Sequence, residues 1–115
     1  MVLKYLKPVF TKRIPEELDS GIMYVCIEGK TMMHLCPCGC GKIVVLPLDR
    51  TFWSFKYDGE NISIFPSIGN YQFPCKSHYW IIDNCIVWDS DLKNDVFSKN
   101  RVQKLMKRIK HLFGA

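Results

Sequence analysis

The segment His34-Leu35-Cys36-Pro37-Cys38-Gly39-Cys40-Gly41 places three thiols within five residues. In an extended strand these thiols would lie on one face, about 6.6 Å apart for each step of two residues. Thiolates that share one zinc ion lie about 2.3 Å from the metal, and hence roughly 4 Å from one another. The chain must therefore curl. Pro37 fixes one φ angle, and the two glycines permit the left-handed angles that a tight knuckle requires.

A fourth metal ligand must come from another part of the chain. Cys75 is the best candidate, because Pro74 precedes it and polar residues follow it, which places it at the end of a loop. His34 and His78 are the alternatives. Four protein ligands make a closed, structural site, whereas an open position is needed for a metal to activate water. The predicted ligands of this structural Zn²⁺ ion are Cys36, Cys38, Cys40 and Cys75.

The remaining two cysteines, Cys26 and Cys85, lie within apolar runs rich in β-formers, so we predict that they belong to the core. The first residues of the chain lack the features of a signal peptide, and this favours a cytoplasmic protein. In a reducing compartment, six cysteines are metal ligands or core residues more often than disulfides. A plain set of buried cysteines is the alternative to the metal site.

Length and composition favour a single folded domain that spans residues 1–115. Hydrophobic residues make up 48% of the chain and charged residues 23%, a balance typical of globular proteins. No apolar run reaches the roughly 18 residues of a membrane-spanning helix, so no membrane is expected as a partner.

The patterning predicts an α+β fold, a small and mainly antiparallel β domain with a zinc knuckle and a C-terminal α-helix. The β-rich part covers about residues 8–90, and Asp58-Gly59 and Asp83-Asn84 are hairpin turns. From about 93 to 113, apolar residues recur at helical spacing and basic residues occupy the other faces. The segments expected to be extended are 23–27, 31–35, 43–46, 52–57, 62–65, 77–82 and 85–88.

Polar residues that can perform acyl transfer occur in two places. Ser67 lies in a segment rich in turn formers, and Ser77 and His78 begin an expected strand. Neighbours in a regular strand point to opposite faces, so Ser77 and His78 are poorly placed to act on each other. Ser67 arrives from a separate segment, and it can meet His78 as nucleophile and base. The alternative is that both residues are structural.

Several motifs in the same order carry a family resemblance. Residues 34–41 are followed by Pro66-Ser67-Ile68-Gly69-Asn70, then by Cys75-Lys76-Ser77-His78-Tyr79-Trp80-Ile81, and then by Val87-Trp88. Over about residues 20–90 this resembles the bacterial family called domain of unknown function 6527. The resemblance implies a component of bacterial ubiquitin-like conjugation operons, beside E1-like, E2-like and ubiquitin-like proteins. In that setting the family acts as a peptidase that trims or removes the ubiquitin-like protein.

Carried over to this chain, the resemblance implies a zinc-stabilised serine peptidase or isopeptidase. Ser67 would attack the carbonyl after the last residue of the modifier, and His78 would transfer the proton. Backbone amides near Gly69 would hold the oxyanion. Ser77 remains an alternative nucleophile. The third member of the triad is not assigned, since Asp83 is close in sequence but lies toward the far end of the expected strand.

The leading hypothesis is therefore a hydrolase whose partners are a ubiquitin-like protein and its conjugates, with E1-like or E2-like proteins as further partners. The alternative is a non-catalytic zinc-binding module that recognises a protein through Trp53, Tyr79 and Trp80. Nucleic-acid binding through the basic segment 99–115 is a third reading, but such a face is more often solvated or rests on an acidic partner. Nucleic acid is not an expected partner.

Overall fold

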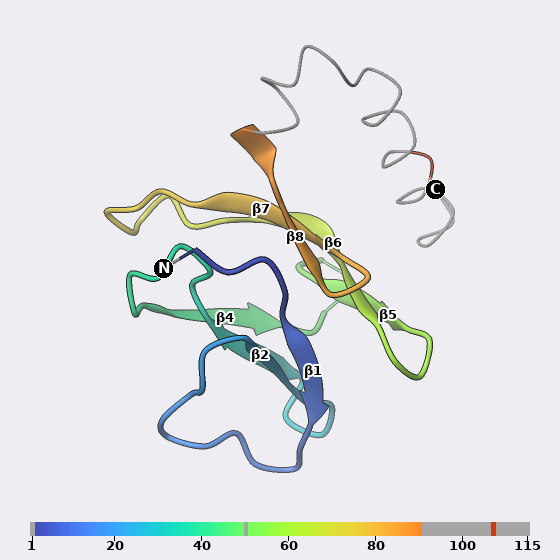
Figure 1. Cartoon of the computed structure of the whole chain (residues 1–115). Coiled ribbons are helices and arrows are strands. Elements are labelled where there is room, and N and C mark those ends of the chain that lie inside the picture. The colour runs from blue at the N-terminus through green and yellow to red at the C-terminus, as the bar shows by residue number, and fades with distance from the viewer. Residues whose placement is uncertain (1, 50, 91–106, 108–115) are drawn as a thin grey trace.

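A computed structural model describes residues 2–49, 51–90 and 107. All eight elements in this part of the chain are strands, and they form two four-stranded sheets (Figure 1). The strands are β1 (Lys7–Phe10), β2 (Ile22–Cys26), β3 (Thr31–Leu35), β4 (Ile43–Pro47), β5 (Ser54–Tyr57), β6 (Ile62–Gly69), β7 (His78–Ile82) and β8 (Cys85–Trp88).

The first sheet has the order β1-β2-β3-β4. β1 runs parallel to β2, and the other neighbours are antiparallel. In β4 the side chains alternate, with Val44 and Leu46 buried and Ile43 and Val45 exposed. Successive residues of a strand point to opposite faces, so this sheet presents one apolar face to the core.

The second sheet has the order β5-β6-β7-β8, and all its neighbours are antiparallel. The turn between β7 and β8 consists of Asp83 and Asn84, whose φ angles are 49° and 68°. Positive φ at both positions is the requirement of a two-residue hairpin turn that matches strand twist. The pairing of β6 with β7 shifts between Ile64 and Ile68, so that β6 carries extra residues there.

The core lies between the two sheets, which face each other in Figure 1. Two isolated bridges, Tyr5 with Cys85 and Leu48 with Trp53, connect them at their margins. Each fully buried aliphatic side chain contributes roughly 1.5–3 kcal/mol to this packing. The most buried members are Leu6, Met23, Val25, Met32, Leu46, Ile62, Ile64, Ile68, Tyr79 and Ile81.

Each of the seven segments expected to be extended overlaps one of the strands β2 to β8. Cys26 is buried, as predicted, and Cys85 is half-buried. β1 and the continuation of β6 to Gly69 were not predicted.

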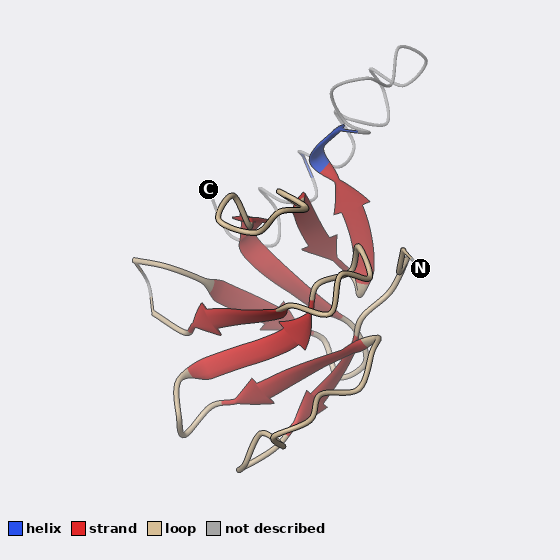
Figure 2. Cartoon of the chain, turned by 90° about the vertical axis from the view of Figure 1, so that its left-hand side faces the viewer, coloured by secondary structure: helices blue, strands red, loops and turns tan. Residues whose placement is uncertain are grey.

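The predicted α+β class is wrong, because the described part of the chain is all-β. Strands and their connecting loops make up its body (Figure 2), and of the described residues only Asp89, Ser90 and Lys107 have helical backbone. The helix expected at 93–113 falls outside the described residues apart from Lys107. Among the described residues, no helix has the length and apolar character needed to cross a bilayer.

Candidate functional site

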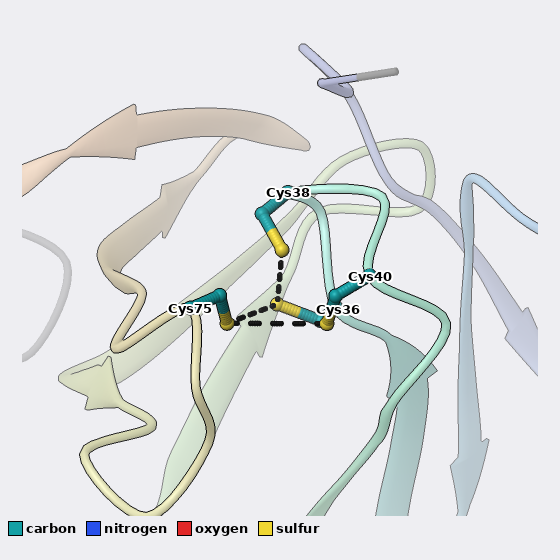
Figure 3. A group of neighbouring side chains, drawn as sticks. All are labelled: Cys36, Cys38, Cys40 and Cys75. Atoms are coloured by element: carbon teal, nitrogen blue, oxygen red, sulfur yellow. Dashed lines mark hydrogen bonds between the residues drawn. The ribbon is translucent and has the colours of Figure 1, made fainter.

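Four cysteine sulfurs converge at one end of the two sheets, as Figure 3 shows. All four lie within 4.8 Å of one another. The Sγ atom of Cys36 is 3.4 Å from that of Cys38 and 3.8 Å from that of Cys75, and the Cys40 and Cys75 sulfurs are 3.9 Å apart. Four thiolates around one zinc ion at about 2.3 Å would be separated by roughly 4 Å. The geometry and the donor set fit a metal ion.

The knuckle that carries three of these sulfurs curls as the sequence predicted. The Gly39 amide donates to the Cys36 carbonyl at 3.1 Å, and the Cys36 amide donates to the Lys42 carbonyl at 2.8 Å. Gly39 and Gly41 have φ angles of 90° and 82°. Side chains other than glycine rarely adopt these angles, so the two glycines permit the loop to close.

The local environment changes how readily the thiols ionise. Desolvation raises the pKa of Cys36, and the hydrogen bond with the Ser77 hydroxyl offsets only part of this rise. Desolvation and the neighbouring thiols raise the pKa of Cys38 to about 12. Desolvation also opposes ionisation of Cys75, but hydrogen bonds from the Ser77 hydroxyl and amide outweigh it and lower its pKa to about 7. The surroundings therefore favour the thiolate of Cys75 and disfavour those of Cys36 and Cys38.

Neither histidine considered as an alternative ligand joins the sulfurs. His34 is fully buried, and its Nε2 atom lies 2.6 Å from the Tyr79 hydroxyl. Desolvation lowers the pKa of His34 to about 3, so the ring is neutral. His78 is directed to Ser67 instead.

Ser77 lies against the cysteines and not against His78. Its Oγ atom is 3.1 Å from Cys36 Sγ and 3.6 Å from Cys75 Sγ, and it accepts a hydrogen bond from Asn70 Nδ2 at 2.9 Å. The side chain is only 6% exposed. Since Asn70 occupies an acceptor position, the Ser77 O–H remains available to donate to a thiolate, which is the role of an outer-sphere residue at a metal centre.

A second polar group surrounds His78, the first residue of β7. Ser67 Oγ is 2.8 Å from His78 Nε2, and His78 Nδ1 is 3.4 Å from Asp89 Oδ2. His78 and Asp89 have side-chain exposures of 28% and 19%, so the pair is largely but not fully shielded from water. A hydroxyl, an imidazole and a carboxylate in this order are the parts that nucleophilic acyl transfer requires.

Asp89 is the site residue that sequence reasoning missed. In the β7–β8 hairpin Tyr79 pairs with Trp88, so the next positions outward, His78 and Asp89, are also opposite each other. The turn at Asp83-Asn84 was predicted, and counting outward from it would have given this pair. Asp83 itself lies at the turn, where its amide donates to Ser63 Oγ at 2.8 Å.

Tyr71 completes the surroundings of the imidazole. Its hydroxyl is 3.2 Å from His78 Nδ1, and the two rings meet edge to face with centroids 5.7 Å apart. A Cβ atom at Gly69 would come within 2.6 Å of the Tyr71 ring. The glycine therefore gives the tyrosine space to lie across β6, where its hydroxyl and Asp89 approach the same nitrogen.

A surface hollow of about 390 Å³ connects the two groups. Its lining includes Cys38, Cys75, Ser77, His78 and Asp89. The cysteine cluster and the histidine–aspartate pair thus border one recess.

A family model described as "Bacterial ubiquitination-like system serine protease (BubE)" matches residues 10–89. The chain belongs to the BubE family. The match covers the cysteine knuckle, both serines, His78 and Asp89. Comparison with curated proteins and with solved structures gave no match. Membership in the BubE family supports the predicted peptidase-like component of a ubiquitin-like conjugation operon, but not the name domain of unknown function 6527.

The three aromatic residues suggested as protein contacts, Trp53, Tyr79 and Trp80, are not all exposed. Tyr79 is fully buried and bonded to His34, so its assignment to an exposed contact surface is wrong. Trp53 and Trp80 are half-buried. In this BubE family member, only Trp53 and Trp80 of the three suggested residues are therefore accessible to a partner protein.

Proposed function

We propose that this chain is a serine peptidase or isopeptidase that processes or removes a bacterial ubiquitin-like protein. The observation that supports it most directly is the approach of Ser67 Oγ to His78 Nε2 at 2.8 Å, with Asp89 on the far nitrogen of the same ring. The description of the BubE family as a serine protease of bacterial ubiquitination-like systems agrees with this arrangement. Ser77 is the less suitable nucleophile, because its hydroxyl contacts sulfur.

The proposed reaction begins when His78 Nε2 accepts the Ser67 proton and Oγ bonds to the carbonyl carbon of the target peptide or isopeptide. The tetrahedral intermediate then loses the amine, which takes the proton from Nε2, and an ester to Ser67 remains. Water attacks this ester, passes one proton to Nε2, and releases the acid as Ser67 recovers its proton. Asp89 accepts the Nδ1 hydrogen throughout and stabilises the imidazolium that forms.

The negative charge on the carbonyl oxygen requires fixed donors. The amide of Gly69 is two residues from the nucleophile and is a backbone donor near Ser67. Preorganised amides of this kind stabilise a developing oxyanion strongly, because they need not reorient during the reaction. We assign the Gly69 amide this part.

The four thiolates would hold a Zn²⁺ ion in a structural role. Four protein ligands leave no position for a reactive water, so when bound the metal supplies a cross-link between the knuckle at 36–40 and the loop before β7. That loop carries Cys75, and His78 follows it by three residues. The metal centre thereby supports the position of the base.

The test is cleavage of a ubiquitin-like precursor with a C-terminal extension by the purified chain, followed by mass spectrometry. Ser67→Ala should abolish cleavage and labelling by a fluorophosphonate, while leaving metal content and the melting temperature unchanged. Ser54→Ala, an exposed serine at the start of β5, is the matched control and should retain full activity. Retained cleavage in Ser67→Ala would overturn the proposal. Binding of the precursor without cleavage by the wild-type chain would instead support the non-catalytic zinc-binding module.

A further inference from the structure

Among the described residues, β6 has an edge without a strand partner next to Ser67. β5 pairs with β6 only from Ile62 to Phe65, the last pair being Ser54 with Phe65. β6 continues to Gly69 and there pairs only with β7 among the strands that residues 2–49 and 51–90 form. Ser67 and Gly69 are both partly exposed. The end of β6 that carries the proposed nucleophile is therefore a strand edge.

The direction of the peptide groups along this edge follows from one hydrogen bond. The Asn70 amide donates to the Ser77 carbonyl at 2.8 Å, so positions 70 and 77 are a hydrogen-bonded pair of the antiparallel ladder. Hydrogen-bonded and non-bonded pairs alternate, so Gly69 and His78 form a non-bonded pair, and Ile68 and Tyr79 form the next bonded one. The amide and carbonyl of Gly69 therefore point away from β7.

The Ser67 carbonyl points to the same side. The amide of Ile68 is directed to β7, and in a planar trans peptide the carbonyl of the preceding residue points the opposite way. The edge thus offers an acceptor at Ser67 and a donor and an acceptor at Gly69. This is the pattern that an additional β-strand can satisfy.

We infer that the segment of the substrate around the cleaved bond binds by adding to β6 as a further strand along Ser67 and Gly69. This inference rests on the proposed function and specifies how that site holds its substrate. The occupant is an extended polypeptide segment, because the proposed reaction must bring a carbonyl of a substrate chain to Ser67. An extended tail satisfies the free backbone groups of an edge without requiring a particular side-chain sequence.

The register of this added strand is fixed if the reacting carbonyl accepts from the Gly69 amide. In an antiparallel strand, the residue that owns this carbonyl donates to the Gly69 carbonyl, and the residue two positions later donates to the Ser67 carbonyl. In a parallel strand the same two substrate residues donate, but to the other carbonyls. The residue that owns the reacting carbonyl then donates to the Ser67 carbonyl, and the residue two positions later donates to the Gly69 carbonyl. Either direction engages the amide of the residue before the cleaved bond and that of the second residue after it. The amide one position upstream, which belongs to the second residue before the cleaved bond, points away from β6.

The experiment uses ten-residue peptides that span the cleavage site of the ubiquitin-like precursor, with the full wild-type chain. One amide at a time is N-methylated, or replaced by an ester to remove the donor without adding bulk. We expect kcat/KM to fall about tenfold for methylation, and about fivefold for the ester, at the residue before the cleaved bond and at the second residue after it. The amide one position upstream should tolerate either change within about threefold.

Two results would overturn strand addition. One is equal tolerance at all three positions, and the other is greater sensitivity at the upstream position than at the two predicted ones. Cleavage of the unmodified peptide in the same series keeps the proposed function intact while strand addition falls. If the unmodified peptide and the whole precursor both remained uncleaved by the wild-type chain, the proposed function would fall, and strand addition with it.

Discussion

Replacing Asp89 by asparagine tests the arrangement that sequence reasoning did not find. The carboxylate lies 3.4 Å from His78 Nδ1. At that distance a pair of unit charges interacts by about 5 kcal/mol at an effective dielectric constant near 20, and by about 1.2 kcal/mol in water. Because the two side chains are 28% and 19% exposed, we take an intermediate value of about 2–3 kcal/mol. Asp89→Asn should therefore reduce kcat by roughly 30- to 150-fold.

The neutral amide has a second effect in the same direction. Its NH₂ group can donate to Nδ1, which places the ring proton on Nε2, and Nε2 can then no longer accept the Ser67 proton. Tyr71 still lies 3.2 Å from Nδ1 in this variant, so a residual positioning of the ring is expected. KM should change little, since Asp89 acts through His78 and not on the substrate.

The assay is single-turnover cleavage of the precursor, which separates chemistry from product release. Asp83→Asn is the matched control, because it makes the same change of charge in the same hairpin, at the turn where Asp83 contacts Ser63. We expect that variant to keep kcat within about threefold of the wild type. If Asp89→Asn also stayed within that range, the assignment of Asp89 as the partner of His78 would be refuted.

Three further outcomes are expected. Cys36→Ser should lower bound metal, measured by atomic emission, from one equivalent to nearly none and destabilise the fold, whereas Cys26→Ser, a buried cysteine outside the cluster, should keep the metal. Ser77→Ala should weaken metal affinity about 10- to 100-fold in a chelator competition, and it should leave fluorophosphonate labelling of the metal-loaded chain intact. Ile81→Ala, at a fully buried position of β7, should lower the free energy of unfolding by about 2–5 kcal/mol in a denaturant titration without altering the stoichiometry of the metal.

The clustering of the four cysteines was predictable because its signal is local and chemically narrow. Three cysteines in five residues, with glycines between and after them, restrict the possible backbone, and Cys75 was the one remaining cysteine at a loop end. The Ser67–His78 contact depends on the pairing of β6 with β7, where an irregular register decides which side chains meet. Sequence patterning does not reveal such an irregularity. The Ser67–His78 contact was therefore predicted only from the chemical roles of serine and histidine and from the family resemblance.

The predicted α+β class was wrong for a different reason. The α+β class depended on a helix at 93–113, and helical periodicity alone is a weak predictor because packing partners can override it. The residues that carried the helical pattern lie outside the described part of the chain, apart from Lys107. The short β1 strand was missed because it pairs with β2 in parallel, and Lys7 and Pro8 at its start give no alternating pattern.

One short loop couples the two chemical groups of this molecule. Asn70 and Ser77 bracket the connection between β6 and β7, and they bond to each other through both backbone and side chain. Ser77 lies against Cys36 and Cys75, so the thiol cluster fixes the end of β7 from which His78 projects. The hydroxyl of Ser77 contacts the sulfurs, whereas the imidazole of the next residue, His78, contacts Ser67. Loss of the metal should therefore disturb the base before it disturbs the core, because the apolar packing between the sheets lies elsewhere.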